Sequence, residues 1–193
     1  MSTLSNFGVP LGGGSGRGGI LMPKVKNRFR VTVMNFGIPS GSIALTQQVV
    51  TVGRPHVTFA PQPVHSYNSI AYFAGKAEWE VLTMTVRDDV TNSVSSLVGA
   101  QVQKQMNFFD ETVPLAASNF KFGMIVEALD GGNDVVLEEW DLEGCFLSDV
   151  NYQSNDYSSS DAMTIEMTIR FDNCTQAGGF MPFNPSLLDG PWT

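Results

Sequence analysis

Residues 78–109, EWEVLTMTVRDDVTNSVSSLVGAQVQKQMNFF, decide the fold class. Residues 78–87 are rich in Trp, Val, Thr, Leu and Met and contain no Gly or Pro, so they predict a long strand. Both faces of this strand carry apolar side chains, which indicates a strand covered on two sides.

After Asp88-Asp89 the spacing of the apolar residues changes to three and four. This spacing predicts an amphipathic helix with one apolar stripe, formed by Val94, Leu97, Val98, Val102, Met106 and Phe109. Thr91 or Asn92 is expected to cap the first turn by accepting a backbone N–H bond. A strand that leads into the one good helix of the chain predicts a sheet with a single helix against it.

The rest of the chain supplies strands around this unit. Alternation of apolar and polar residues predicts strands over 28–36, 135–146 and 162–172. Two further strands are expected over 43–52, which is lightly polar on both faces, and over 120–129. Residues 130–134, DGGND, predict a hairpin turn. Residues 55–75 contain three prolines, and their segment 64–73 fits an exposed hairpin arm. On this basis the domain spans 28–173, between a flexible Gly-rich arm (1–27) and a Pro- and Phe-rich C-terminal extension (174–193).

Composition sets limits on the function. A chain of 193 residues with 42% hydrophobic residues is long and apolar enough for one domain with a sizeable core. No apolar run approaches the roughly 20 residues of a membrane helix, and no signal peptide is evident, so a product that remains in the cytoplasm is expected. Two cysteines, Cys145 and Cys174, are expected to be packed thiols, with a bond between chains as the alternative.

Charge is unevenly distributed along the sequence. Residues 1–77 contain seven Lys or Arg and no acid, whereas the remainder contains four bases and all 19 acids. The net charge of −8 makes general affinity for nucleic acid unlikely. Two interpretations stay open: head-to-tail contact between identical subunits, or mixing of the two charge signs over one surface by folding.

Two polar strand faces are candidate functional surfaces. Glu139, Asp141 and Glu143 share one face of the strand 135–146, with roughly 7 Å between successive carboxylates. Glu166 and Arg170 lie on the polar face of the strand 162–172. Each face is interpreted as lumen wall, as subunit contact or as a merely solvated surface.

No catalytic or metal-binding constellation is evident in the sequence. His56 and His65 have no ligand spacing with each other or with the cysteines, and the acids of 130–134 lack the spacing of a calcium loop. No nucleophile has a general base in a recognisable pattern. We therefore expect no enzyme activity, no cofactor and no metal.

The order of elements resembles the tail tube proteins of contractile-tailed bacteriophages. The resemblance covers residues 26–172 and is carried by FRVTV (29–33), AEWEV (77–81), EWDLEGCF (139–146) and the alternating strand 163–171. It implies a mainly β (α+β) fold, a twisted β-sandwich or small β-barrel with one flanking helix. The Gly-rich arm, the C-terminal extension and an enlarged segment 55–75 depart from the family pattern.

The same resemblance implies an assembly. Six copies would form a ring, and rings would stack into a hollow tube through which DNA passes without specific binding. The implied partners are a tail sheath protein, baseplate proteins and a tail-terminator protein, with no membrane. The implied location is the virion, after assembly in the host cytoplasm.

Other functions remain open on the sequence alone. A tube-initiating baseplate protein, a tail-terminal ring protein and a type VI-like secretion tube share the same pattern. A monomeric ligand-binding β-barrel would need an apolar interior cavity, and a hydrolase would need an active site that the sequence does not indicate.

Overall fold

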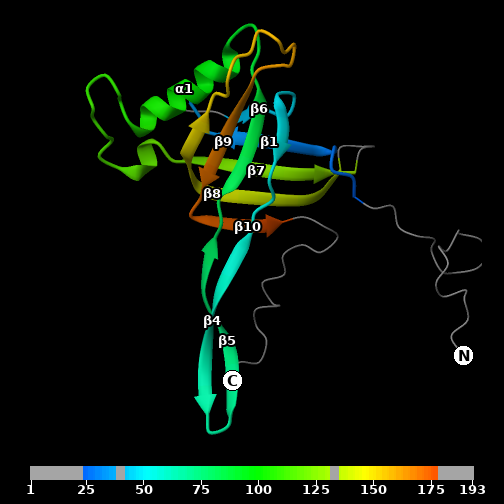
Figure 1. The fold of residues 1–193 in the computed structure, drawn as a ribbon, viewed down its shortest axis with the longest axis vertical. Helices are drawn as coiled ribbons and strands as arrows, with labels where there is room; N and C mark the ends of the chain where they lie inside the picture. Colours follow the sequence, from blue (N-terminus) through cyan, green and yellow to red (C-terminus); the bar gives the residue numbers. More distant parts are fainter. Residues whose placement is uncertain (1–23, 38–41, 131–134, 178–193) are drawn as a thin grey trace, which may run out of the picture.

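The computed structural model describes residues 24–37, 42–130 and 135–177 (Figure 1). The predictions for residues 1–23 of the arm, for the loop 38–41, for the turn 131–134 and for the extension 178–193 lie outside the described residues. The strands are β1 (Phe29–Met34), β2 (Ser42–Ala44), β3 (Val49–Val52), β4 (Val57–Ser66), β5 (Ser69–Trp79), β6 (Leu82–Arg87), β7 (Phe122–Leu129), β8 (Val136–Asn151), β9 (Thr164–Arg170) and β10 (Asn173–Ala177). The helices are α1 (Ser93–Gln105) and the short 3-10 helix η2 (Ala117–Asn119).

Eight strands form one antiparallel sheet in the order β2-β1-β7-β8-β9-β6-β3, with β10 paired to β8. β8 spans 16 residues and belongs to two layers. Its first part pairs with β7 and β10, and its second part pairs with β9. In Figure 1 the strands β1 and β7 run across the long axis of the molecule while β6 and β9 run more nearly along it, so the layers cross steeply.

The inner faces of the two layers enclose a single hydrophobic core. The fully buried side chains include Val31, Val33, Met84, Met124, Leu142, Met167 and Ile169. Alternation produces this core: every second residue of β1, β6 and β9 is buried, and those between are exposed or half-buried. The predicted mainly β sandwich with one flanking α-helix is confirmed. The small-barrel alternative is not, because the described strands form no closed barrel.

The predicted strand 78–87 is interrupted in the structure. β5 ends at Trp79 and β6 begins at Leu82, so residues 80–81 separate two strands that pair with different partners. β6 is buried on one face only, since Leu82, Met84 and Val86 face the core while Val81 is 44% exposed. The expectation of a strand covered on two sides was wrong, because the apolar residues of the second face lie at the strand junction.

Helix α1 packs against one end of the sandwich. Val94 and Val98 are buried, and the buried amide of Gln101 accepts a bond from the backbone N–H of Gly37 (3.0 Å) and donates to the carbonyl of Phe120 (2.6 Å). The predicted apolar stripe is observed from Val94 to Val102. Met106 lies beyond the helix in extended backbone and Phe109 is 94% exposed, so the stripe was drawn too long.

The helix cap differs from the prediction. Asn92 stands at the N-cap with left-handed backbone (φ 59°), and its side chain makes no capping bond. The Asp89 carboxylate instead accepts bonds from the backbone N–H of Ser93 (3.0 Å), from the Ser93 hydroxyl and from the Thr91 hydroxyl. These bonds, those of Ser93 above all, hold the pKa of Asp89 below its ordinary value.

Two further strand predictions need correction. The predicted strand 43–52 is two short strands, β2 and β3, which pair with β1 and β6 respectively. In β8, Gly144 adopts φ 68° at a bulge, where a Cβ atom would lie 2.3 Å from a carboxylate oxygen of Asp172. The bulge reverses the alternation, so Cys145 and Leu147 enter the core. Phe146, predicted to share a face with Trp140 and Leu142, instead packs edge-on against Phe120 at 6.4 Å.

Strands β4 and β5 form a separate two-stranded sheet. Figure 1 shows this hairpin extending far from the body of the molecule along its long axis. The exposed arm predicted over 64–73 is therefore present, and it is longer than predicted because β4 begins at Val57 and β5 continues to Trp79.

Candidate assembly surfaces

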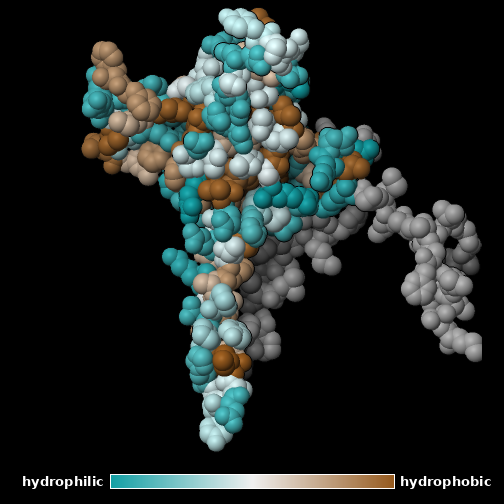
Figure 2. All heavy atoms as spheres, in the orientation of Figure 1, coloured by the Kyte–Doolittle hydropathy of each residue, from teal (hydrophilic) through white to brown (hydrophobic). Residues whose placement is uncertain are grey.

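The β4–β5 hairpin exposes large apolar side chains over most of its length. The exposed fractions are 55% for Phe59, 49% for Val64, 51% for Ile70, 68% for Tyr72 and 56% for Phe73. Apolar atoms are visible along the projecting arm in Figure 2. An isolated hairpin of this kind is only marginally stable in water, so its length and composition indicate a surface that is covered in use.

Both faces of the hairpin are apolar. Directly opposed residues point to the same face, so Tyr72 shares a face with Pro63, and Phe73 shares the other with Gln62. The Tyr72 face is continuous with the sandwich, because Trp79 at its base packs against Phe171 with ring centroids 5.7 Å apart. The arm can therefore contact partners on two sides.

The two outer edges of the hairpin differ in hydrogen-bonding capacity. Pro61 and Pro63 lie in β4, opposite Ala74 and Tyr72 of β5. A proline in an antiparallel pair has its nitrogen on the side away from the partner, so the outer edge of β4 lacks two donors. β5 contains no proline. The edge of β5 is the one that can add a further strand.

The three predicted acids of β8 lie on the outer face of the sandwich. Glu139 and Asp141 are half-buried and Glu143 is exposed. Glu139 stands directly opposite Glu127 of β7, and the Glu127 carboxylate accepts two bonds from Arg30 of β1 at 2.5 and 2.9 Å. The structure thus forms a continuous acidic strip across β7 and β8, defined here as Glu127, Glu139, Asp141 and Glu143, with Arg30 at its margin.

Glu166 and Arg170 lie elsewhere on the outer surface. Both are exposed residues of β9, in the layer that β9 forms with β6. Glu166 accepts a bond from the Gln153 amide (3.2 Å), and Arg170 pairs with Glu78 of β5 (3.0 Å). Arg170 thus links the sandwich to the base of the hairpin, and the pair does not join the acidic strip.

A second exposed apolar surface was missed by sequence reasoning. The loop that follows α1 exposes Phe108 (58%), Phe109 (94%), Val113 (68%) and Leu115 (105%). Figure 2 shows these apolar atoms on the arm of chain beside α1. The signal was present in the sequence, but Phe109 was assigned to the helix stripe and residues 113–119 were interpreted only as a connection between elements.

Ion pairs within the chain join the basic first part of the sequence to its acidic remainder. Three of the ion pairs in the described residues join a base of the first 77 residues to an acid of the remainder: Lys24–Glu138, Arg54–Glu138 and Arg30–Glu127. Intrachain mixing of the two signs is therefore observed for these residues. Contact between subunits through charge stays a prediction.

Cys145 and Cys174 are buried free thiols, and burial raises the pKa of Cys145 to about 12 and that of Cys174 to about 11. Within the described ranges, no group of three or more His, Cys, Asp and Glu residues could hold a metal ion. None of the described helices is long and apolar enough to cross a membrane.

Comparison with solved structures identifies proteins of similar fold. The chain is similar to the anti-feeding prophage tube-terminating cap (13% identity, 86% of this chain and 97% of that chain, TM-score 0.64). It is also similar to the sheath–tube complex of an extracellular contractile injection system (14% identity, 81% and 92%, TM-score 0.59) and to the SPP1 tail tube (9% identity, 87% and 86%, TM-score 0.53). No protein-family model matches the sequence, and no curated protein matches it either.

These likenesses define the class of fold. These structural neighbours are proteins of contractile injection systems and of a phage tail tube, and the chain covers 86–97% of each of the three. The resemblance expected from the sequence is confirmed at the level of the fold.

Proposed function

We propose that this protein is the tube subunit of a contractile tail or a related injection particle, six copies forming a ring and rings stacking into a hollow conduit. The observation that carries this proposal is the hairpin with two apolar faces, in a chain whose fold matches tube-associated proteins. Such an arm is unstable by itself and is stabilised when neighbouring copies cover it. The role is structural, without catalysis.

The two edges of the hairpin differ in whether they can pair with a strand of a neighbouring copy, and the β5 edge can. A strand from a neighbouring copy added at this edge satisfies backbone groups and removes an unpaired edge. The edge of β4, with Pro61 and Pro63, resists the same addition. If the β5 edge pairs with a different edge of the neighbouring copy, such as that of β3 at the end of the large sheet, the contacts are head-to-tail and close into a ring when the rotation fits.

The acidic strip is proposed to face the lumen or a neighbouring copy. On a lumen wall, carboxylates repel phosphates and leave DNA no adhesive site during ejection. The remaining polar residues are also proposed as contact residues: Arg170, which pairs with Glu78 at the hairpin base, and Glu166, further along β9. The sheath, baseplate and terminator proteins are the proposed external partners, in a tail assembled before release of the virion.

Asp141→Lys tests the acidic strip. The substitution reverses one charge on an outward-facing position, so we expect an intact fold by circular dichroism together with impaired ring assembly or impaired DNA passage. Wild-type assembly and infectivity would show that this face is only solvated. Asp161→Lys, at an exposed acid of the loop between β8 and β9, is the matched control.

A tube-end ring is the second candidate, favoured by the similarity to the tube-terminating cap. Negative-stain electron microscopy of the concentrated, purified chain separates the two. Six-fold rings that stack into tubes support the tube subunit, and rings that never stack support the tube end. A monomer at every concentration, alone and with a tube-initiating complex, contradicts both.

A further inference from the structure

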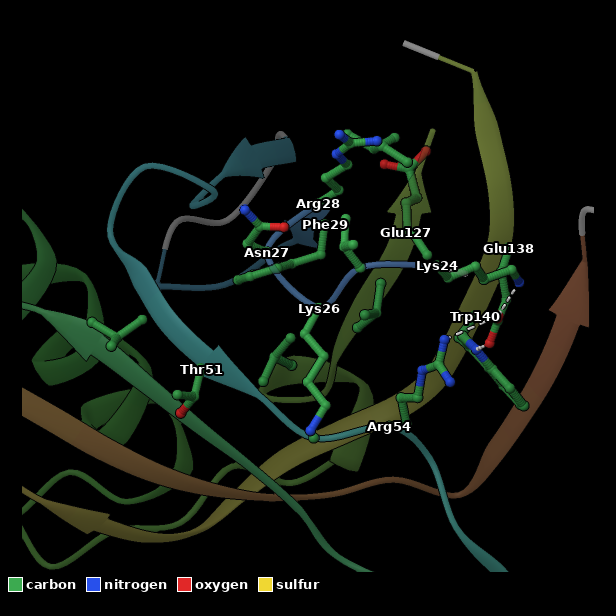
Figure 3. Close-up of a pocket in the computed structure, with 17 residues that line it drawn as sticks. Lys24, Lys26, Asn27, Arg28, Phe29, Thr51, Arg54, Glu127, Glu138 and Trp140 are labelled. Carbon is green, nitrogen blue, oxygen red and sulfur yellow. Dashed lines mark hydrogen bonds and ion pairs between the residues drawn. The ribbon is translucent and has the colours of Figure 1, made fainter. Parts of the chain in front are cut away.

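A pocket of about 750 Å³ opens at the end of the sandwich where the two layers meet. Its walls are the inner face of β1, β7 and β8 on one side and residues of β3 on the other (Figure 3). The apolar part of the lining consists of Phe29, Val50, Val52, Val126, Leu129 and Trp140. Val50 is 42% exposed, so this apolar surface remains accessible.

The rim of the pocket is cationic. Lys24, Lys26, Arg28 and Arg54 line it, against the two carboxylates Glu127 and Glu138. Lys24 (2.7 Å) and Arg54 (3.1 Å) converge on one oxygen of Glu138, and the indole N–H of Trp140 donates to the other (2.5 Å).

The charge left on this rim is positive. Burial raises the pKa of Glu138, but the bonds from Lys24 and Trp140 and the charge of Arg54 outweigh it, so the pKa lies below its ordinary value. The carboxylate is therefore ionised at neutral pH. Glu127 is already paired with Arg30, so the rim retains a positive excess that suits an acidic occupant.

The chain leaves the sandwich beside this pocket. β10 pairs with β8 so that Gln176 stands opposite Trp140 and Ala177 opposite Glu139. Because neighbouring strands lie about 4.8 Å apart, the described part of the chain ends at Ala177 close to the wall formed by Glu138 and Trp140. The residues that follow read GGFMPFNPSLLDGPWT, with five large apolar or aromatic side chains besides Met, one acid and no base.

We propose that residues 180–192 of this chain occupy the pocket, their apolar side chains against its floor and Asp189 toward its cationic rim. Gly178-Gly179 supplies the backbone freedom for the chain to turn beneath the sheet edge. A random-coil segment of ten residues has an end-to-end distance of about 18 Å, which is enough to reach the pocket from Ala177. This inference is independent of the proposed tube function.

The N-terminal segment is the competing occupant, since Lys24 itself lines the pocket. Residues 1–23 contain Arg17 and no acid, so the cationic rim repels them. Charge therefore selects the C-terminal segment over the N-terminal one.

Cysteine cross-linking in the full chain tests the proposal. Val50→Cys with Ser186→Cys places one thiol in the pocket and one in the segment, nine residues beyond Ala177. Asp141→Cys with Ser186→Cys is the control on the opposite face of the sheet. Val50→Cys with Ser15→Cys is the matched control for the N-terminal segment, nine residues before Lys24. The native thiols remain protonated near neutral pH and do not compete.

With a short bis-maleimide reagent, we expect the 50/186 pair to react within one chain about tenfold faster than either control. All three pairs have a tether of similar length, and only binding in the pocket holds the thiol at position 186 next to the thiol at position 50. Adding Asp189→Lys should lower that rate several-fold. Equal rates for the three pairs, faster reaction of the 15/50 pair, cross-links between chains, or an unchanged rate with Asp189→Lys would each overturn the proposal.

Discussion

The sandwich and the β4–β5 hairpin are built from similar residues but differ in what covers them. In β9, Ile165, Met167 and Ile169 are at most 2% exposed, because they belong to the core between the two layers. In β5, Ile70, Tyr72 and Phe73 are more than half exposed. Burial of apolar side chains within one chain thus stabilises the sandwich. The large apolar side chains of the hairpin remain exposed in the single chain and are available for contacts with other copies.

This difference separates residues that maintain the fold from residues available for association. A substitution in the core should change the stability of the single chain. A substitution on the hairpin should leave that stability almost unchanged and act on assembly. The two regions can therefore be distinguished by measuring both properties for matched substitutions.

The largest expected effect is on the free energy of unfolding, when isoleucine is replaced by alanine in the sandwich and, for comparison, in the hairpin. Ile169→Ala removes a fully buried side chain and should lower the free energy of unfolding by about 2–5 kcal/mol. Ile70→Ala, at a 51% exposed position, should change it by less than about 0.5 kcal/mol. Urea denaturation of dilute protein gives both values. Similar losses for the two variants would show that the hairpin is stabilised within the single chain.

A smaller effect is expected from two glycines of the body. Gly144→Ala places a Cβ at positive φ and against the carboxylate of Asp172, which is bonded to Lys121, so we expect a loss of about 1–3 kcal/mol. Gly99→Ala lies in α1 with nothing within 4 Å of the added atom, and we expect a gain of about 0.5–1 kcal/mol. Thermal unfolding of both variants measures the contrast. A neutral Gly144→Ala would mean that the bulge does not require glycine.

The smallest effect concerns the cap of α1 and depends on pH. The Ser93 bonds lower the pKa of Asp89 below 3.8, so the ionised cap stabilises the fold above pH 3.8, and this contribution is lost as pH falls through the lowered pKa. Ser93→Ala should therefore reduce the urea midpoint near neutral pH, and the difference from wild type should shrink on acidification below pH 3.8. Ser148→Ala, which removes a bond to a carbonyl, is the control expected to show no such pH dependence. A constant difference for Ser93→Ala would rule out the ionised cap.

The sequence predicted the elements that bury a regular apolar face. The alternation of 163–171 and the stripe from Val94 to Val102 reflect contacts with one core, so period and burial agree. Two features escaped prediction because they depend on tertiary context. The bulge at Gly144 moves Cys145 and Leu147 inward, and the Asp89 cap follows from the chain path before α1.

The candidate surfaces were predicted only in part. Strict alternation placed Glu139, Asp141 and Glu143 on one face, as the structure shows. Glu127 and Arg30 join that face only through strand pairing, which a single strand's pattern does not reveal. The pocket depends on the approach of β3 to β8, whose residues are far apart in the sequence.

The most direct test of the central claim compares two tyrosines. Tyr72→Asp changes a tyrosine of the hairpin that is 68% exposed, and Tyr157→Asp changes a more exposed tyrosine (111%) in the loop between β8 and β9. Sedimentation velocity over a range of concentrations measures assembly, and circular dichroism confirms the fold. We predict that Tyr72→Asp remains a folded monomer while wild type and Tyr157→Asp form ring-sized species. Ring formation by Tyr72→Asp at wild-type concentrations would contradict the assignment of the hairpin as the association element.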